Sequence, residues 1–176
     1  MTNIIYGRNH SSILNKAIDD AKSELYITSY GITSYGLTFD LIKKIHDKAA
    51  NGVNFYFVVG VSDKYNQSME LGKLFYLQYW TIKHNYTGNI FLSVKEDKHG
   101  KVLIKDCDFA VVGSYNWLTS QNNNWDNYST VLTDKNDIQT LKDLILNNNS
   151  MLIENLKLTK NNILEHNFGD KKVTNG

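Results

Sequence analysis

Hydrophobic and polar residues alternate near the start of the chain with the period of a helix and then with that of a strand. In residues 12–22, the apolar positions Ile13, Ala17 and Ala21 recur at helical spacing behind a serine that can cap the helix. The segment 24–28 that follows contains Leu, Tyr, Ile and Thr, which are residue types typical of strands. The pattern predicts a helix followed by a strand.

A second helix and a second strand are predicted directly afterwards. Thr38 can cap the helix, Gly52 can end it, and residues 53–59 form an apolar run typical of a buried strand. The buried stripe of this helix consists of four residues: Leu41, Ile42, Ile45 and Ala49. Repeated alternation of helix and strand is typical of an α/β fold.

The rest of the chain continues with short strands between two further helices. The expected elements are a helix over 67–80, strands over 89–94, 101–104, 109–112 and 128–132, and a helix marked by Ile138, Leu141 and Ile145. The polar link 105–108 joins two of these strands as a hairpin would require. Because the chain has no proline and no Gly-rich linker, we expect one mixed α/β domain.

Length and composition agree with one folded domain. The chain has 176 residues, of which 41% are hydrophobic and 21% are charged, far from the composition of disordered chains. Its 19 Lys and Arg residues balance 18 Asp and Glu residues, so net charge neither supports nor excludes a nucleic-acid partner. Any phosphate-binding surface has to be local.

Cysteine usage and the ends of the chain predict a cytoplasmic protein. Cys107 is the single cysteine and cannot form an internal disulfide, and we expect it to be inert in apolar surroundings. The first residues lack the features of a signal peptide, no apolar run approaches the roughly 18 residues of a membrane span, and neither end carries a lipidation motif. We therefore expect no membrane association.

A constellation of polar residues in the second half of the chain can hold a small anion. From His99 the sequence reads H-G-K-V-L-I-K-D-C-D-F-A-V-V-G-S-Y-N-W, which gives the pattern H-x-K-x4-D-x6-G-S-x-N. His99 and Lys101 alternate along a strand and project to one side, as do Ser114 and Asn116. If the two strands are neighbours, a nucleophile, a cation and neutral hydrogen-bonding groups converge, as a phosphate requires.

This pattern is similar in every fixed position to the HKD motif of the phospholipase D superfamily. Six such matches would arise by accident with a probability on the order of 10⁻⁵ or less. The resemblance implies a mixed-sheet α/β/α sandwich, with a catalytic domain over residues 1–158 and a polar tail over 159–176 that is compatible with disorder. It also implies metal-independent hydrolysis through a covalent phosphohistidine, without a cofactor.

One motif in a chain of this length resembles the small single-motif nucleases of the superfamily. In that subgroup two motifs meet across a two-fold axis, so the resemblance implies a homodimer whose active site lies at the interface. The expected activity is that of a phosphodiesterase, most simply an endonuclease that hydrolyses DNA or RNA. The residues do not favour DNA over RNA or a single strand over a double strand, and they favour no base sequence.

The resemblance assigns a role to each motif residue. His99 is expected to act as nucleophile or general acid, depending on the protomer, and Lys101 and Asn116 are expected to bind the phosphoryl group. Ser114 is expected to add a hydrogen bond to the substrate. Asp106 completes the catalytic motif, although we expect it to hold structure instead of touching substrate.

Further positions near the motif are candidates for a pocket wall and for orienting the histidine. Trp117, next to Asn116, is expected to form a wall of the pocket. Families of this kind often place a Glu shortly after the G-S-x-N segment to orient the histidine, but residues 119–133 contain no Glu. Asp126 is the nearest acid and can take that role; Asn127 or Ser129 can hydrogen-bond the imidazole instead.

The remaining histidines and aromatic residues are expected to be structural. The four histidines outside the motif are interpreted as exposed helix or loop residues without metal partners: His10, His46, His84 and His166. We predict no metal site. Four aromatic residues could stack on unpaired bases, but we favour a place in the core for them: Tyr76, Tyr79, Trp80 and Tyr86. Lys95 and Lys98 lie near the motif and could steer a phosphate backbone.

Two alternatives stay open at this point. The same motif serves phospholipases and phosphatidyl transferases, although these usually carry two motifs in a longer chain. The missing Glu also permits a catalytically weak binding module that dimerises and holds nucleic acid, partnered with a helicase or a defence complex.

Overall fold

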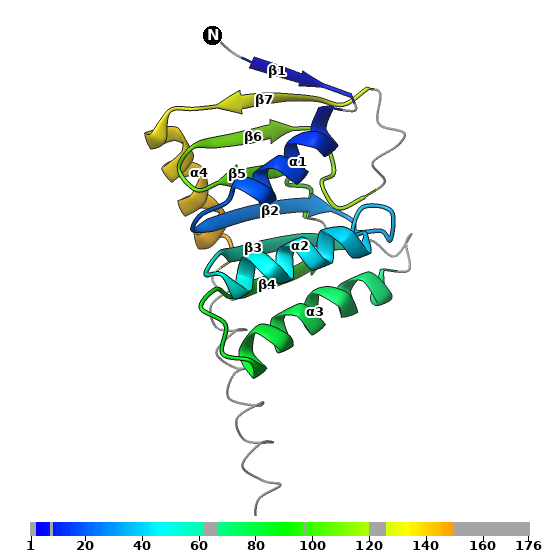
Figure 1. Ribbon diagram of the computed structural model, residues 1–176. Helices are drawn as coiled ribbons and strands as arrows, with labels where there is room; N and C mark the ends of the chain where they lie inside the picture. The colour runs from blue at the N-terminus through cyan, green and yellow to red at the C-terminus, as the bar shows by residue number, and fades with distance from the viewer. Residues whose placement is uncertain (1–2, 8, 62–66, 97, 120–125, 150–176) are drawn as a thin grey trace, which may run out of the picture.

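A seven-stranded mixed sheet organises the chain in the computed structural model, which describes residues 3–7, 9–61, 67–96, 98–119 and 126–149 (Figure 1). The strands are β1 (Asn3–Tyr6), β2 (Glu24–Tyr30), β3 (Asn54–Val61), β4 (Ile90–Glu96), β5 (Val102–Lys105), β6 (Phe109–Gly113) and β7 (Tyr128–Leu132). The helices are α1 (Asn9–Asp20), α2 (Phe39–Ala50), α3 (Ser68–Lys83) and α4 (Lys135–Asn147). None of these helices is long and apolar enough to cross a bilayer.

The strand order brings the ends of four strands, β2, β3, β5 and β6, to the side of the sheet where the predicted motif lies. The order is β1-β7-β6-β5-β2-β3-β4, in which β2, β3 and β4 are parallel and the other neighbours are antiparallel. The carboxyl ends of β2 and β3 therefore meet the amino end of β5 and the carboxyl end of β6. We call this side of the sheet the motif edge; it lies on the right in Figure 1.

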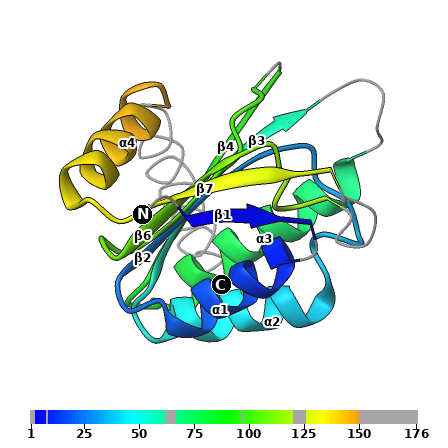
Figure 2. The same ribbon diagram turned by 90° about the horizontal axis from the view of Figure 1, so that it is seen from above.

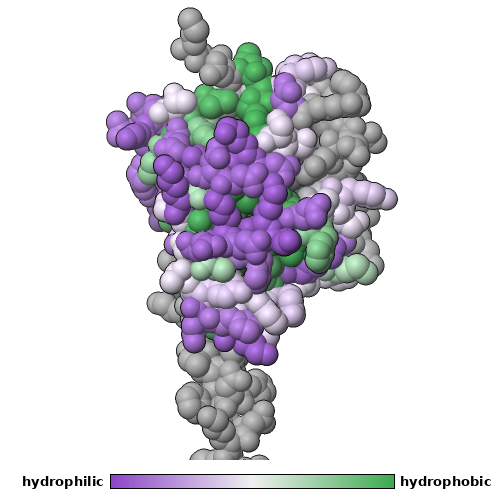
Figure 3. Space-filling view, viewed as in Figure 1, coloured by the Kyte–Doolittle hydropathy of each residue, from purple (hydrophilic) through white to green (hydrophobic). Residues whose placement is uncertain are grey.

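Helices cover both faces of the sheet, so the predicted α/β/α sandwich is confirmed. Figure 2 shows α1, α2 and α3 on one face and α4 on the other. The outer sides of α1 and α2 are strongly hydrophilic, and hydrophobic residues lie exposed along β1 (Figure 3). The predicted hairpin is also present, because β5 and β6 pair as antiparallel neighbours.

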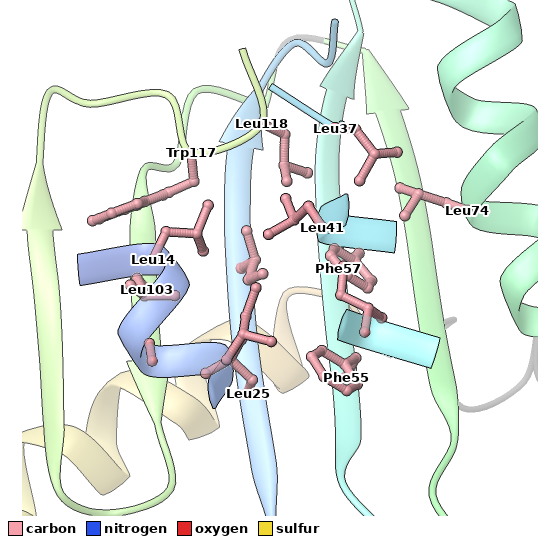
Figure 4. Close-up of a cluster of buried hydrophobic side chains, with 14 of the residues drawn as sticks. Leu14, Leu25, Leu37, Leu41, Phe55, Phe57, Leu74, Leu103, Trp117 and Leu118 are labelled. Carbon is pink, nitrogen blue, oxygen red and sulfur yellow. The ribbon is translucent and has the colours of Figure 1, made fainter. Parts of the chain in front are cut away.

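The main core lies between the sheet and the three helices of the first face. Figure 4 shows Leu41 of α2 near Phe57 of β3, and Leu14 of α1 near Trp117. The fully buried side chains include Leu14, Leu25, Ile45, Phe55, Phe57, Leu74 and Trp117. Burial of each large apolar side chain contributes roughly 1.5–3 kcal/mol, so this layer is the largest favourable term in holding the motif edge in place.

Local signals fix the ends of the helices. The Thr38 hydroxyl accepts a hydrogen bond from the N–H of Leu41 at 3.2 Å, as the sequence predicts, and the C-terminal end of α2 is followed by Gly52 at a φ of 97°. The edge strand β1 was not predicted from the sequence. The expected tail, 159–176, lies outside the described residues.

Candidate active site

Tyr30 joins His99 and Lys101 at the motif edge. The imidazole of His99 stacks on the Tyr30 ring, with 4.0 Å between centroids and 17° between planes. The Lys101 ammonium lies 5.7 Å from the centroid of the same ring and donates a hydrogen bond to the His99 carbonyl at 2.8 Å. A cation and an exposed imidazole are thus held around one aromatic ring.

The third motif residue is fixed by the backbone of the same tyrosine. The N–H of Tyr30 donates to Asn116 Oδ1 at 3.2 Å. Because the carbonyl side of the amide is engaged there, its NH₂ group points elsewhere and remains a donor. His99, Lys101 and Asn116 therefore meet at Tyr30, although Asn116 follows β6 and the other two precede β5.

Two glycines allow the backbone to approach closely at this edge. A Cβ on Gly60 would lie 1.9 Å from the carbonyl oxygen of Lys98, so only glycine lets the segment before β5 cross the end of β3. A Cβ on the motif glycine, Gly113, would lie 2.1 Å from Ser129 Oγ. At both positions a side chain would collide with the neighbouring segment, so each requires a residue without a side chain.

Partial burial changes the acidity of the motif lysine. Loss of water around the Lys101 ammonium lowers its pKa from the usual value, because the charged form is less well solvated. No carboxylate of the described residues pairs with this ammonium. An anion that binds beside Lys101 would supply the missing counter-charge.

Ser114 is held by the strand next to it. Its hydroxyl donates to Asn127 Oδ1 at 3.0 Å and accepts from the N–H of Tyr128 at 3.1 Å. Asp126 is exposed, and no carboxylate in the described ranges hydrogen-bonds to the His99 imidazole. Asn127 therefore lies against the motif, whereas the predicted orienting role of Asp126 finds no contact here.

Ser129 serves a different histidine. Its hydroxyl lies 2.9 Å from His10 Nε2, and His10 Nδ1 lies 2.7 Å from the carbonyl of Gly7. His10 is completely buried and stacks on Tyr115 at 4.4 Å, so the prediction that it is exposed is wrong. Burial lowers the pKa of His10, and its hydrogen bond with Gly7 offsets only part of that effect.

Asp106 lies apart from the other members of the catalytic set, although its structural role is the one that the sequence predicts. It follows β5, whereas His99 precedes this strand, so the two residues lie at opposite ends of it. The Asp106 carboxylate accepts hydrogen bonds from three backbone N–H groups, those of Lys22, Ser23 and Glu24, at 2.9–3.2 Å. It fixes the turn before β2 instead of contacting the motif edge.

Trp117 is also placed differently from the prediction. Its side chain is 1% exposed and points into the main core between α1 and the sheet (Figure 4). The ring lies 5.1 Å from Tyr115 and 5.7 Å from His10. Trp117 therefore supports the segment that carries Asn116 and does not form a pocket wall.

A cavity of about 220 Å³ lies beside the motif edge on the α4 face of the sheet. Its floor contains Thr28, Val58 and Val102, and its rim includes Lys98 and Gly100, which flank His99 in the chain. Since about 150 Å³ suffices for a benzene ring, the cavity can accept one ring-sized group. The other predicted steering lysine, Lys95, donates to the Asn148 carbonyl at 2.9 Å.

Sequence reasoning missed Tyr30, although a signal for it exists. Tyr30 is the last residue of β2, and ligands of α/β folds bind beyond the carboxyl ends of parallel strands. Among the described residues, no three His, Cys, Asp or Glu side chains gather as metal ligands would. The chemistry that this edge offers is that of an imidazole, an ammonium and an amide around one anion.

Comparison with known families and structures agrees with this arrangement. The model of a family described as "Cardiolipin synthase, PLD-like domain" matches residues 14–147. No curated protein sequence matches the chain significantly.

Solved structures of similar fold are numerous. Nuc from Salmonella typhimurium, described as a phospholipase D family member, is 18% identical with a TM-score of 0.57, over 81% of this chain and 90% of its own. NucT from Helicobacter pylori is 18% identical with a TM-score of 0.57, over 88% and 96% of the two chains. The archaeal chromatin protein TrmBL2 is 13% identical with a TM-score of 0.55, over 81% of this chain and 50% of its own. At these identities the likeness concerns the fold.

Proposed function

Because the chain belongs to the family of phospholipase D-like domains, we propose that it is a metal-independent phosphodiesterase that cleaves nucleic-acid backbones as a homodimer. The observation that carries this proposal is the meeting of His99, Lys101 and Asn116 at Tyr30. An exposed imidazole beside a cation and an amide donor matches the needs of phosphoryl transfer.

The proposed reaction has two steps. An unprotonated ring nitrogen of His99 attacks phosphorus, the bond from phosphorus to the leaving oxygen breaks, and the protonated His99 of the partner subunit donates its proton to that oxygen. Water then attacks the phosphohistidine, gives its proton to the partner's His99 and breaks the P–N bond. Both imidazoles return to their starting states, so the cycle needs no further reagent.

Lys101 and Asn116 have distinct parts in this scheme. The ammonium of Lys101 neutralises charge on the phosphoryl oxygens, which offsets the loss of water that lowers its own pKa. The NH₂ group of Asn116 donates to the same oxygens, because its Oδ1 is already engaged with Tyr30. Removing one such donor typically lowers turnover by about 10²–10³.

A homodimer accounts for the second imidazole. The chain carries the motif once, and the scheme requires two histidines on opposite sides of phosphorus. The exposed position of His99 at the motif edge leaves it accessible to another copy. Nuc and NucT, which match over most of their length, support the nuclease assignment through their names and similar size.

The test is hydrolysis of bis(p-nitrophenyl) phosphate and of plasmid DNA in excess EDTA, with wild type beside His99→Ala. We expect turnover in EDTA that is lost in the variant, and a dimer by sedimentation equilibrium. Hydrolysis that requires a divalent cation, or that persists in His99→Ala, would contradict the proposal. A parallel assay with phospholipid liposomes tests the lipid phosphodiesterase alternative. That alternative predicts hydrolysis of the lipid and none of the DNA.

A weak or inactive binding module is the second candidate. The observation that favours it is the absence, within the described part of the chain, of a carboxylate bonded to the His99 imidazole. A dimer that binds DNA but leaves both the plasmid and the small diester intact would establish this candidate. Partners such as a helicase would then supply the activity.

A further inference from the structure

Aromatic side chains form a continuous stripe along the second half of α3. The stripe consists of Tyr76, Tyr79, Trp80 and His84 at the end of the helix. Ring centroids are 6.5 Å apart for Tyr76 and Tyr79, 5.5 Å for Tyr76 and Trp80, and 4.3 Å for Trp80 and His84. Residues at these spacings share one side of a helix, so the rings lie in a row.

This α3 stripe does not contribute its outer rings to the core. Tyr76 is 59% exposed and Tyr79 is 36% exposed, so the prediction that they are core residues is wrong. The core side of α3 is formed by Leu74 and Leu77, which are buried. In Figure 3 the surface over α3 is paler than the strongly hydrophilic surface of α2. An exposed aromatic row of this kind is a candidate interaction surface.

The charges beside the α3 stripe favour an anionic partner. The Lys83 ammonium lies 5.6 Å from the centroid of Tyr79 and 5.9 Å from that of Trp80. Residues 71–84 contain no carboxylate, and the one acid of the helix, Glu70, is buried beside Lys73. The aromatic faces are therefore accompanied by positive charge, without a nearby carboxylate of the same helix to repel phosphates.

We propose that the α3 stripe binds unpaired bases of a single nucleic-acid strand. The inference rests on the proposed function, since it specifies which nucleic acid the site receives. Aromatic rings stack on the faces of bases, and only an unpaired strand can turn those faces toward a protein surface. The lysine beside the rings then contacts the phosphate backbone.

The helix also connects the stripe to the motif edge. The Gln67 side chain, just before α3, accepts a hydrogen bond from the N–H of Ile32 at 3.0 Å, two residues after Tyr30. From Ser68 to Tyr76 the helix rises about 12 Å, at 1.5 Å per residue. A strand whose phosphate lies near His99 can therefore continue along α3.

The test measures binding of a fluorescent 20-nucleotide oligothymidylate by anisotropy, in a full-length His99→Ala background that prevents cleavage. We expect Tyr76→Ser and Tyr79→Ser each to weaken binding roughly tenfold, within the range of base stacking, and Tyr76→Phe to retain it. Lys83→Gln should lower the salt dependence by about one counter-ion. Affinity for a 20-base-pair duplex should not change.

The matched control is Tyr35→Ser, which removes an equally polar ring that is 75% exposed in the connection between β2 and α2. Oligothymidylate affinities within about twofold of the parent for both stripe variants, or equal losses for duplex, would overturn the inference. So would a change of oligomeric state in Tyr76→Ser, since the stripe would then join two copies. Hydrolysis of bis(p-nitrophenyl) phosphate by the stripe variants with His99 restored separates this inference from the proposed function. The small diester has no bases and does not need the α3 stripe. Failure to hydrolyse it would therefore count against the proposed function alone.

Discussion

The ring of Tyr30 stacks on the imidazole of His99 at 4.0 Å, while the backbone N–H of Tyr30 binds the side chain of Asn116 at 3.2 Å. One residue at the end of β2 thus orients two motif residues through two different groups. The stack depends on the side chain, whereas the hydrogen bond depends only on the backbone. Substitutions at Tyr30 can therefore separate the two effects.

Tyr30→Leu should lower kcat for bis(p-nitrophenyl) phosphate by about ten- to a hundredfold, because the imidazole loses the surface that fixes its ring plane. Tyr30→Phe keeps that surface and should retain most of the activity. The measurement is kcat and KM for both variants, with melting temperatures to confirm folding. Equal activity of Tyr30→Leu and wild type would show that the stack does not position His99.

Asn116→Asp should lower kcat/KM by about 10²–10³, because it replaces the NH₂ donor by an anionic oxygen of the same size. The bond from the Tyr30 N–H to Oδ1 can persist, so stability should change little. Asn136→Asp makes the same change in the first turn of α4 and should leave kcat/KM unaltered. If Asn116→Asp were as active as that control, the phosphoryl group would not bind at Asn116.

The affinity for phosphate should fall at a lower pH than it would if Lys101 had the pKa of an ordinary lysine. Burial lowers the pKa of Lys101, and an anion binds the protonated form better; affinity is therefore greatest below that pKa and falls as pH rises through it. The dissociation constant of inorganic phosphate, measured by calorimetry between pH 7 and 10, should rise in wild type. In Lys101→Arg it should stay level, since a guanidinium keeps its proton over this range. Parallel curves for the two proteins would exclude Lys101 as the titrating group.

Periodicity was sufficient for most of the fold because the buried faces are regular. Of the predicted α2 stripe, Leu41, Ile45 and Ala49 are buried and Ile42 is partly buried. Strand β7 has the predicted bounds, 128–132. The strand β1 escaped prediction because its four residues carry too few positions for a period to show. In α1 the helix begins earlier than expected, and its buried face is centred on Leu14 and Ile18, whereas Ile13 is only partly buried.

Side-chain contacts over long distances in sequence explain the errors around the site. Spacing alone places His99 and Lys101 together, but Tyr30 enters through strand order, which the local pattern does not contain. Trp117 follows Asn116 and was therefore expected at the surface; the turn after β6 directs it into the core. Cys107 was expected in apolar surroundings, yet it is exposed and lies 3.0 Å from the Lys142 ammonium.

Asp106→Asn should lower the free energy of unfolding by about 2–3 kcal/mol without changing kcat of the folded enzyme. Burial raises the pKa of Asp106, but hydrogen bonds from Glu24, Ser23 and Lys22 outweigh it, so the net pKa is lowered. The stabilisation is therefore present at neutral pH and lost as pH falls through that lowered pKa. Asp108→Asn, an exposed carboxylate in the same turn, should cost no more than about 1 kcal/mol. Urea unfolding measures both; a loss of kcat in Asp106→Asn at full folding would return this residue to the catalytic set.

His10 should make the protein less stable as pH falls from 7.5 to 5.5. Burial holds its pKa below the ordinary value of about 6.5, so below pH 6.5 the unfolded chain binds a proton that the folded chain does not. Each pH unit in that interval, down to the lowered pKa, then removes up to about 1.4 kcal/mol from the free energy of unfolding.

His10→Gln should be less stable at pH 7.5, because its contacts with Ser129 and Tyr115 change, but its stability should vary less with pH. His84→Gln, at an exposed position, is the control for the loss of an imidazole without the buried contacts of His10. Urea unfolding at pH 5.5, 6.5 and 7.5 distinguishes these cases, and an unchanged slope in His10→Gln would mean that another group titrates.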